Sequence, residues 1–188
     1  QTAEAITLTA PGTMLTGGLC RSYTIGAARL AATAGVRVEG RSTAGADSGK
    51  AQAAAAVFPT DAETFLKEDT LAHGLFGPST LAILCRTAEE LREVAQGLEG
   101  QLTVTIHGTA EDFAQHGDLF SLLETKAGRL IVNGFPTGVE VSPAMQHGGP
   151  YPATTDSRST SVGTAAIERF ARPVCYQDFP QALLPAEL

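Results

Sequence analysis

The residues with the clearest capacity for chemistry lie in one long polar segment, residues 133–163, directly after the apolar run 130–132. The segment concentrates glycine, proline and hydroxyl side chains without helical or strand periodicity, and it contains His147. A loop of this length inside a compact chain is usually functional. An imidazole there can hydrogen-bond a polar substrate or change its charge near neutral pH. The alternative is a loop histidine in water with no catalytic role.

A hydroxyl-rich cluster, residues 156–161, surrounds the charge pair Asp156 and Arg158. A guanidinium and hydroxyl donors are suited to a phosphate or carboxylate ligand. However, no glycine-rich phosphate motif surrounds the cluster, and neither G-x-G-x-x-G nor a Walker pattern occurs in the chain. We therefore predict a loop held by its own Asp156 to Arg158 contact. The same absence indicates that the chain has no dinucleotide-binding half of its own.

Several segments resemble one enzyme family. The strand-like run 129–133, followed by the segment 147–163, is similar to the end of the catalytic domain in NAD(P)-dependent aldehyde dehydrogenases. The Leu-Phe-Gly-Pro run at 75–78 and the Arg-Pro-Val-Cys-Tyr run at 172–176 resemble the same family. The nearest branch is that of the α-ketoglutaric semialdehyde and fatty-aldehyde dehydrogenases. The resemblance implies that this chain is the C-terminal part of the catalytic domain, with the long loop bordering the aldehyde tunnel.

The resemblance also implies substrate-binding residues. His147 occupies the position of a residue that lines the substrate entrance. Three further residues are expected in the same wall: Phe135, Asn133 and Glu140. Their expected ligand is a small-molecule aldehyde.

Phe76 is expected to contact the cofactor, NAD or NADP. It belongs to a run similar to the family's Glu-x-Phe-Gly-Pro motif, in which the phenylalanine flanks the nicotinamide half. The carboxylate of that motif is replaced by Gly74, which cannot accept the two hydrogen bonds of the ribose hydroxyls. The alternative is that residues 75–78 are only a turn that leads into the next strand.

The chain offers no clear nucleophile and no metal site. Cys20, Cys85 and Cys175 are odd in number and widely spaced, as reduced thiols are, and they lack zinc-ligand spacing. None matches the family's cysteine motif, and we predict that each behaves as a small hydrophobe. The resemblance implies that the nucleophilic cysteine lies upstream. No catalytic residue is therefore assigned, and the chain alone is not expected to bind the cofactor or oxidise aldehyde.

Composition excludes other classes of protein. With 188 residues, 43% apolar and 18% charged, the chain can bury a sizeable core. A formal charge of −7 without a basic run argues against nucleic acid as a partner. The apolar runs are too short to span a membrane and the first residues do not resemble a signal peptide, so we predict a cytoplasmic location without membrane attachment.

Periodicity and capping signals predict an α/β fold, a mostly parallel sheet covered by helices. Thr60 and Thr87 each precede a glutamate by three residues, which is the capping-box pattern of a helix start. Other helices are predicted over residues 17–34, 112–127 and 164–171. Strands are predicted over residues 36–41, 51–58, 81–85, 102–106, 130–132 and 174–179. We expect 81–85 and 102–106 to pair in parallel through a right-handed crossover.

Two hypotheses follow. In the first, residues 1–172 are part of an aldehyde dehydrogenase catalytic domain and residues 173–188 form a C-terminal interface strand and tail. The parent enzyme would then oxidise an aldehyde or semialdehyde to its acid. In the second, the chain is a non-catalytic oligomeric scaffold or binding protein that kept the fold, which Gly74 favours. Both predict self-association, because apolar faces and sheet edges need a partner.

Overall fold

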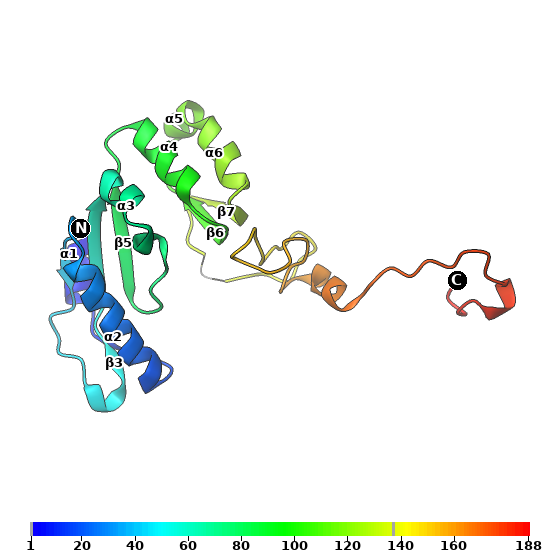
Figure 1. The fold of residues 1–188 in the computed structure, drawn as a ribbon, viewed down its shortest axis with the longest axis horizontal. Helices are drawn as coiled ribbons and strands as arrows, with labels where there is room; N and C mark the ends of the chain where they lie inside the picture. The colour runs from blue at the N-terminus through cyan, green and yellow to red at the C-terminus, as the bar shows by residue number, and fades with distance from the viewer. Residues whose placement is uncertain (1, 137) are drawn as a thin grey trace. The chain divides into compact units, whose positions relative to one another are not determined.

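The computed structural model describes residues 2–136 and 138–188, without the side chains of Thr2 and Ser48. The chain divides into two compact units, Gln1–Leu98 and Glu99–Leu188, and each is described by itself. Unit 1 contains helices and strands in the order α1 Thr2–Leu8, β1 Gly12–Thr13, α2 Gly17–Ala32, β2 Gly40–Arg41, β3 Gln52–Ala53, β4 Ala56–Asp61, α3 Ala62–Lys67, β5 Ser79–Leu84 and α4 Ala88–Gly97 (Figure 1). Short 3-10 helices lie at Ser48–Lys50 and Asp69–Ala72.

The centre of unit 1 is a parallel pair, β4 and β5, joined by a crossover that contains α3. Their register runs from Ala56 opposite Ser79 to Asp61 opposite Leu84. β2 adds a short antiparallel pairing to β4, and β1 pairs antiparallel with β3. The buried core around this sheet consists of Val36, Ala56, Phe58, Ala62, Phe65, Leu71 and Val94. The predicted α/β class is therefore confirmed, with longer parallel strands and shorter antiparallel ones.

α2 forms where helical periodicity predicted it and ends two residues earlier, at Ala32. The helix begins at the Thr16 cap, whose hydroxyl accepts from the Leu19 N–H at 3.1 Å. After the helix, Gly35 adopts a left-handed φ of 81°, and a Cβ there would lie 2.6 Å from the Thr64 hydroxyl. Glycine thus lets the chain that follows α2 pass close to α3.

One of the two predicted helix caps is correct. The Thr87 hydroxyl accepts from the Glu90 N–H at 3.1 Å at the start of α4. The Thr60 prediction is wrong by one residue, because Asp61 caps α3 and accepts from the Thr64 N–H at 2.8 Å. Thr60 is the second-last residue of β4, and its buried hydroxyl donates to the Gly35 carbonyl at 3.1 Å. Threonine and aspartate both form helix N-caps, so the length of the preceding buried strand decides whether Thr60 or Asp61 caps α3.

Two strand predictions in unit 1 need correction. The predicted strand 51–58 divides into β3 and β4, and Ala51 before them has a left-handed φ of 51°. Of the predicted strand 36–41, only the last two residues form a strand, β2. The earlier residues are still tied to β4, because the N–H groups of Arg37 and Glu39 donate to Pro59 and Val57 carbonyls.

Unit 2 contains β6 Gln101–Ile106, α5 Ala110–Gln115, α6 Gly117–Glu124 and β7 Ala127–Val132. β6 and β7 pair in parallel, from Gln101 opposite Ala127 to Ile106 opposite Val132, and Phe113 of α5 packs edge-on against Phe120 of α6. The strands predicted at 102–106 and 130–132 form, with helical structure between them as predicted. The predicted helix 112–127 is divided into two, however, because His116 separates α5 from α6.

The predicted parallel pairing of 81–85 with 102–106 is not found among the described strands. β5 pairs with β4, and β6 pairs with β7, in separate sheets. Both strands and the helix α4 between them form as predicted. Strand positions follow from local pattern, whereas the choice of neighbour depends on packing.

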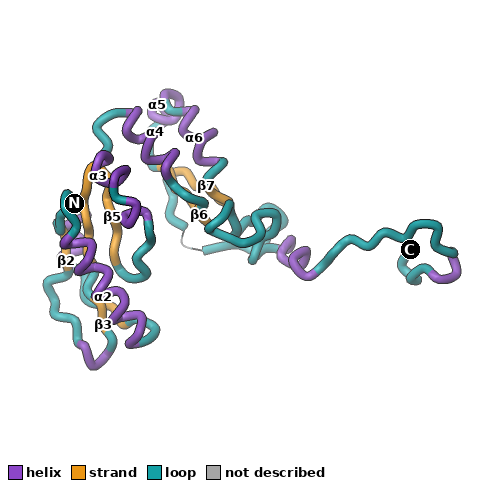
Figure 2. The backbone as a smooth tube through the Cα atoms, in the orientation of Figure 1, coloured by secondary structure: helices purple, strands orange, loops and turns teal. Residues whose placement is uncertain are grey.

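Residues 133–163 of unit 2, apart from the undescribed residue 137, contain no helix or strand, as the sequence predicted (Figure 2). A 3-10 helix follows at Thr164–Phe170, where a helix was expected, and a shorter one lies at Gln181–Leu183. The predicted strand 174–179 does not form, because none of the described strands pairs with it. Cys175, expected to be a buried small hydrophobe there, is exposed.

Candidate functional site

The Phe76 turn, residues 73–78, lies between the 3-10 helix Asp69–Ala72 and β5. Leu75 packs inward against α2, at the place where a Cβ on Gly26 would meet it at 2.4 Å. The Phe76 ring instead points outward and is 72% exposed. An aromatic face held at the surface in this way is free to stack on a flat ligand.

Tyr23 of α2 stabilises the Phe76 turn by packing against Gly77 and bonding to nearby backbone carbonyls. Its buried hydroxyl donates to the Ala54 carbonyl at 2.8 Å and also lies 3.3 Å from the Pro78 carbonyl. Gly77 adopts a φ of 153°, and a Cβ there would lie 2.2 Å from the Tyr23 ring. Burial raises the pKa of the Tyr23 phenol, so it stays a neutral donor at physiological pH. Tyr23 lies within the predicted helix 17–34, but no sequence signal linked it to this turn.

Gly74 meets nothing within 4 Å of where a Cβ would be. It lines a cleft of about 270 Å³ together with residues that include Leu30, Leu71 and His73. A side chain at position 74 therefore has room, but glycine supplies no oxygen that could accept from ribose hydroxyls. The described turn fits a cofactor through the Phe76 ring and not through a carboxylate.

Asn133 and Phe135 lie at the carboxyl ends of β6 and β7. Asn133 bonds to the backbone of Gly108, which follows β6, through both its side-chain amide atoms. The Phe135 ring packs on His107 with 5.2 Å between ring centroids, and it is 76% exposed. His107, which follows β6, thus supports Phe135.

His147 lies at the opposite ends of the same strands. A Cβ on Gly128, at the start of β7, would lie 2.0 Å from the Gly148 carbonyl. Similarly, a Cβ on Gly149 would lie 2.3 Å from the Gln101 carbonyl, at the start of β6. β7 has six residues, and at about 3.3 Å per residue the two ends are roughly 17 Å apart. The structure therefore does not bring His147 together with Phe135 and Asn133.

The backbone of His147 is held by two hydroxyl residues. Its N–H donates to Thr160 Oγ1 at 2.9 Å, and its carbonyl accepts from the Ser161 hydroxyl at 3.0 Å. Its Nδ1 atom is buried and has no hydrogen-bond partner in the described part of the chain. The ring borders a cleft of about 40 Å³ that Asp156 and Arg169 also line. This space is sufficient for a water molecule or one small polar group.

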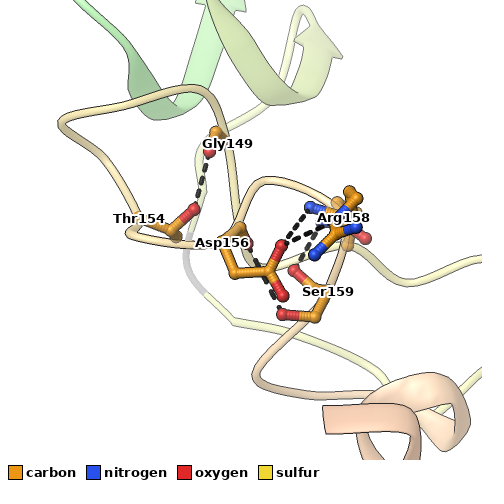
Figure 3. A network of polar contacts seen from close by, with 6 residues as sticks. Gly149, Thr154, Asp156, Arg158 and Ser159 are labelled. Carbon is orange, nitrogen blue, oxygen red and sulfur yellow. Dashed lines mark hydrogen bonds and ion pairs between the residues drawn. The ribbon is translucent and has the colours of Figure 1, made fainter. Parts of the chain in front are cut away.

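The turn at Asp156 is held as the sequence predicted (Figure 3). Asp156 Oδ1 accepts from the backbone N–H of Arg158 at 3.1 Å and from its Nε–H at 3.3 Å. These bonds, the backbone one first, lower the pKa of the Asp156 carboxyl. The nearby Thr154 hydroxyl donates to the Gly149 carbonyl at 2.7 Å. The predicted contact between Asp156 and Arg158 is therefore confirmed.

Arg129 of β7 supports the middle of the loop, a contact the sequence did not predict. Its Nη1 donates to the Gly138 carbonyl at 2.9 Å and lies 3.9 Å from Met145 Sδ. Glu140, expected in the substrate wall, lies in this stretch and is exposed. A basic residue within an apolar strand was the available signal for such a contact.

The cysteines do not resemble activated nucleophiles. Burial, with a smaller contribution from Glu90, raises the pKa of the Cys85 thiol, which disfavours the thiolate. The Cys20 thiol donates to the Gln52 carbonyl at 3.3 Å. All three cysteines are free, and the described residues contain no group of three potential His, Cys, Asp or Glu metal ligands. In the described region, no helix combines the length and hydropathy that crossing a membrane requires.

Comparison with known proteins gives the class of this chain. No protein-family model matches it. It is 48% identical over 186 residues, 99% of the chain, to the α-ketoglutaric semialdehyde dehydrogenase 2 of Azospirillum brasilense. It is 52% identical over 135 residues, 71% of the chain, to the α-ketoglutaric semialdehyde dehydrogenase of Acinetobacter baylyi. The chain therefore belongs to the aldehyde dehydrogenase superfamily, as the resemblance indicated. It spans only 35% and 26% of these relatives' lengths.

Proposed function

We propose that this chain is the C-terminal part of an NAD(P)-dependent aldehyde dehydrogenase that oxidises a semialdehyde to its acid. The observation that carries the proposal is the 48% identity over 186 residues to a protein named for α-ketoglutaric semialdehyde. The bound dinucleotide would supply the hydride acceptor. This chain would supply the aromatic face of Phe76 and a wall of the aldehyde tunnel from residues 133–163.

The full-length protein that contains this sequence provides the first test. Incubation with α-ketoglutaric semialdehyde and either NAD or NADP is expected to raise absorbance at the nicotinamide band, and the faster reaction identifies the cofactor. A protein that binds neither dinucleotide and forms no acid would refute the proposal and favour the alternative, a non-catalytic scaffold. That alternative is supported by Gly74, which leaves the ribose without its acceptor.

Phe76→Ala tests the cofactor role separately. Because the ring is 72% exposed, its removal is expected to leave stability unchanged. Loss of one stacking contact should raise the KM for the cofactor about fivefold, within the range of aromatic pair energies. Ile25→Ala, which removes another exposed apolar side chain of unit 1, is the matched control. An unchanged cofactor KM in Phe76→Ala would remove Phe76 from the site.

The isolated 188-residue chain is proposed to be inactive, because none of its cysteines matches the family's cysteine motif and burial raises the pKa of the Cys85 thiol. Sustained NADH or NADPH formation by the pure chain would contradict this. The free cysteines are compatible with a reducing, cytoplasmic location.

Residues 173–188 are proposed to be an interface segment. They carry exposed apolar side chains at Val174, Tyr176, Phe179, Leu183 and Leu188. Exposed apolar groups of this kind favour association. Light scattering is expected to show an oligomer of the full-length protein that removal of these residues dissociates, and an oligomer that survives truncation would contradict the assignment.

A further inference from the structure

The chain leaves β7 through a left-handed residue. Asn133 has a φ of 51°, a conformation that asparagine adopts more readily than other side-chain-bearing residues. Its N–H still donates to the Ile106 carbonyl at 2.9 Å, which continues the pairing of β7 with β6. The long loop therefore changes direction at this one residue.

The side chain of Asn133 pairs with the backbone of Gly108. Oδ1 accepts from the Gly108 N–H at 2.9 Å, and Nδ2 donates to the Gly108 carbonyl at 2.9 Å. This two-bond arrangement, called the Asn133 clamp below, extends the β6 and β7 pairing by one side chain. Both amide atoms are used for holding backbone, which is a different task from contacting a ligand.

Gly108 is fixed on its other side by α5. A Cβ on Gly108 would lie 2.8 Å from Phe113 Cε1, so the glycine allows a close approach. The next residue, Thr109, caps α5 in a reciprocal capping box with Asp112. The Asn133 clamp therefore attaches the start of the loop to a rigid helix start.

The clamp also determines where Phe135 lies. His107 precedes Gly108 and Phe135 follows Asn133 by two residues, and their rings meet at 5.2 Å with a 46° tilt. The remaining surface of Phe135 is exposed and available to a ligand. A loop that left β7 in another direction would carry this ring away from His107.

We propose that Asn133 is a positioning residue for aldehyde binding, one that orients Phe135 through Gly108 without touching the substrate. The inference rests on the proposed function, because it assigns Phe135 to the aldehyde wall. It replaces the expectation that Asn133 itself belongs to that wall.

The test uses variants of the full-length protein. Asn133→Gly keeps the left-handed conformation and removes the clamp, and we expect the aldehyde KM to rise about three- to tenfold, the range of one net hydrogen bond, with kcat within about twofold. Asn133→Asp keeps an acceptor for the Gly108 N–H and should restore part of the loss. An unchanged aldehyde KM in Asn133→Gly, with or without a fall in kcat, would overturn the proposal.

A second measurement separates this inference from the proposed function. Hydrogen–deuterium exchange of the peptide that contains Gly108 should become faster in Asn133→Gly. Thr125→Ala, which removes a 2.7 Å bond from a hydroxyl to the Leu122 carbonyl at the end of α6, should leave that exchange unchanged. A wild-type protein without aldehyde oxidation would count against the proposed function alone, whereas unaltered exchange in Asn133→Gly would overturn the clamp.

Discussion

The Phe76 turn in unit 1 and the loop of residues 134–163 in unit 2 are held in place by different means. In the turn, one buried side chain, Tyr23, fills the space beneath Gly77 and bonds to backbone carbonyls. In the loop, Gly148 and Gly149 lie directly against the backbone of Gly128 and Gln101. Both regions need glycines at close approaches, but the atoms that crowd Gly77 belong to a side chain, whereas those that crowd Gly149 belong to the backbone.

This difference predicts which substitutions each region tolerates. Adding a methyl group to a glycine at a backbone contact leaves no flexible atom to move aside, so the cost should be high. Removing one hydroxyl from a packed ring costs only a hydrogen bond. The loop should thus be the more sensitive region to small-to-large changes.

Gly128→Ala should have the largest effect. The new Cβ would lie 2.0 Å from the Gly148 carbonyl, and overpacking of this kind should lower the free energy of unfolding by about 3 kcal/mol. Gly117→Ala is the control, because a Cβ there meets nothing within 4 Å and alanine favours the helix. Urea unfolding measures both variants, and equal stabilities would show that the loop does not rest on β7.

Thr160→Val tests the hydrogen bonds that hold the loop near His147. Thr160 is 3% exposed, and valine keeps its shape but leaves the His147 N–H without its acceptor. The expected loss is about 2 kcal/mol of unfolding free energy. Thr155→Val makes the same chemical change at an exposed position and should be nearly neutral. A neutral Thr160→Val would mean that backbone contacts alone hold this part of the loop.

Tyr23→Phe tests the Phe76 turn and should cost about 1 kcal/mol, because the ring remains and one hydroxyl bond is lost. The raised pKa of Tyr23 adds a pH dependence. The contribution of Tyr23 to folding stability is complete below the ordinary tyrosine pKa of about 10 and is lost as pH rises through the higher folded-state pKa. Alkaline unfolding followed by circular dichroism should show this loss in the wild type and not in Tyr23→Phe.

Asp156→Asn should have the smallest effect, confined to acid. The lowered pKa of Asp156 means that its stabilisation is present above the ordinary carboxyl pKa of about 4 and disappears as pH falls through the folded-state pKa. On acidification, the variant should therefore lose less unfolding free energy than the wild type, because it lacks the contribution of the Asp156 carboxylate. At pH 7 the two proteins should have similar stability, because the pair is exposed. An acid profile identical to wild type would show that this turn is held without its charge.

The sequence predicted many of the residues in the candidate site, but it did not predict how they are arranged in space. The Asp156 to Arg158 contact follows from two residues that are close in sequence. The roles of Tyr23 and Arg129 do not, because each side chain reaches a backbone carbonyl that local patterns do not identify. Asn133 was selected correctly as a residue of interest, but its pairing with Gly108 depends on β6 and β7 being neighbours.

The sequence by itself determined the family, the α/β class, the position of α2 and the Thr87 cap, because these depend on composition, local periodicity and residues a few positions apart. Only the tertiary structure decided that Asp61 rather than Thr60 begins α3, that β5 pairs with β4, and that His147 and Phe135 lie at opposite ends of two strands. The physical reason is that strand partners and close backbone approaches are set by packing between distant segments, on which a local pattern carries no information.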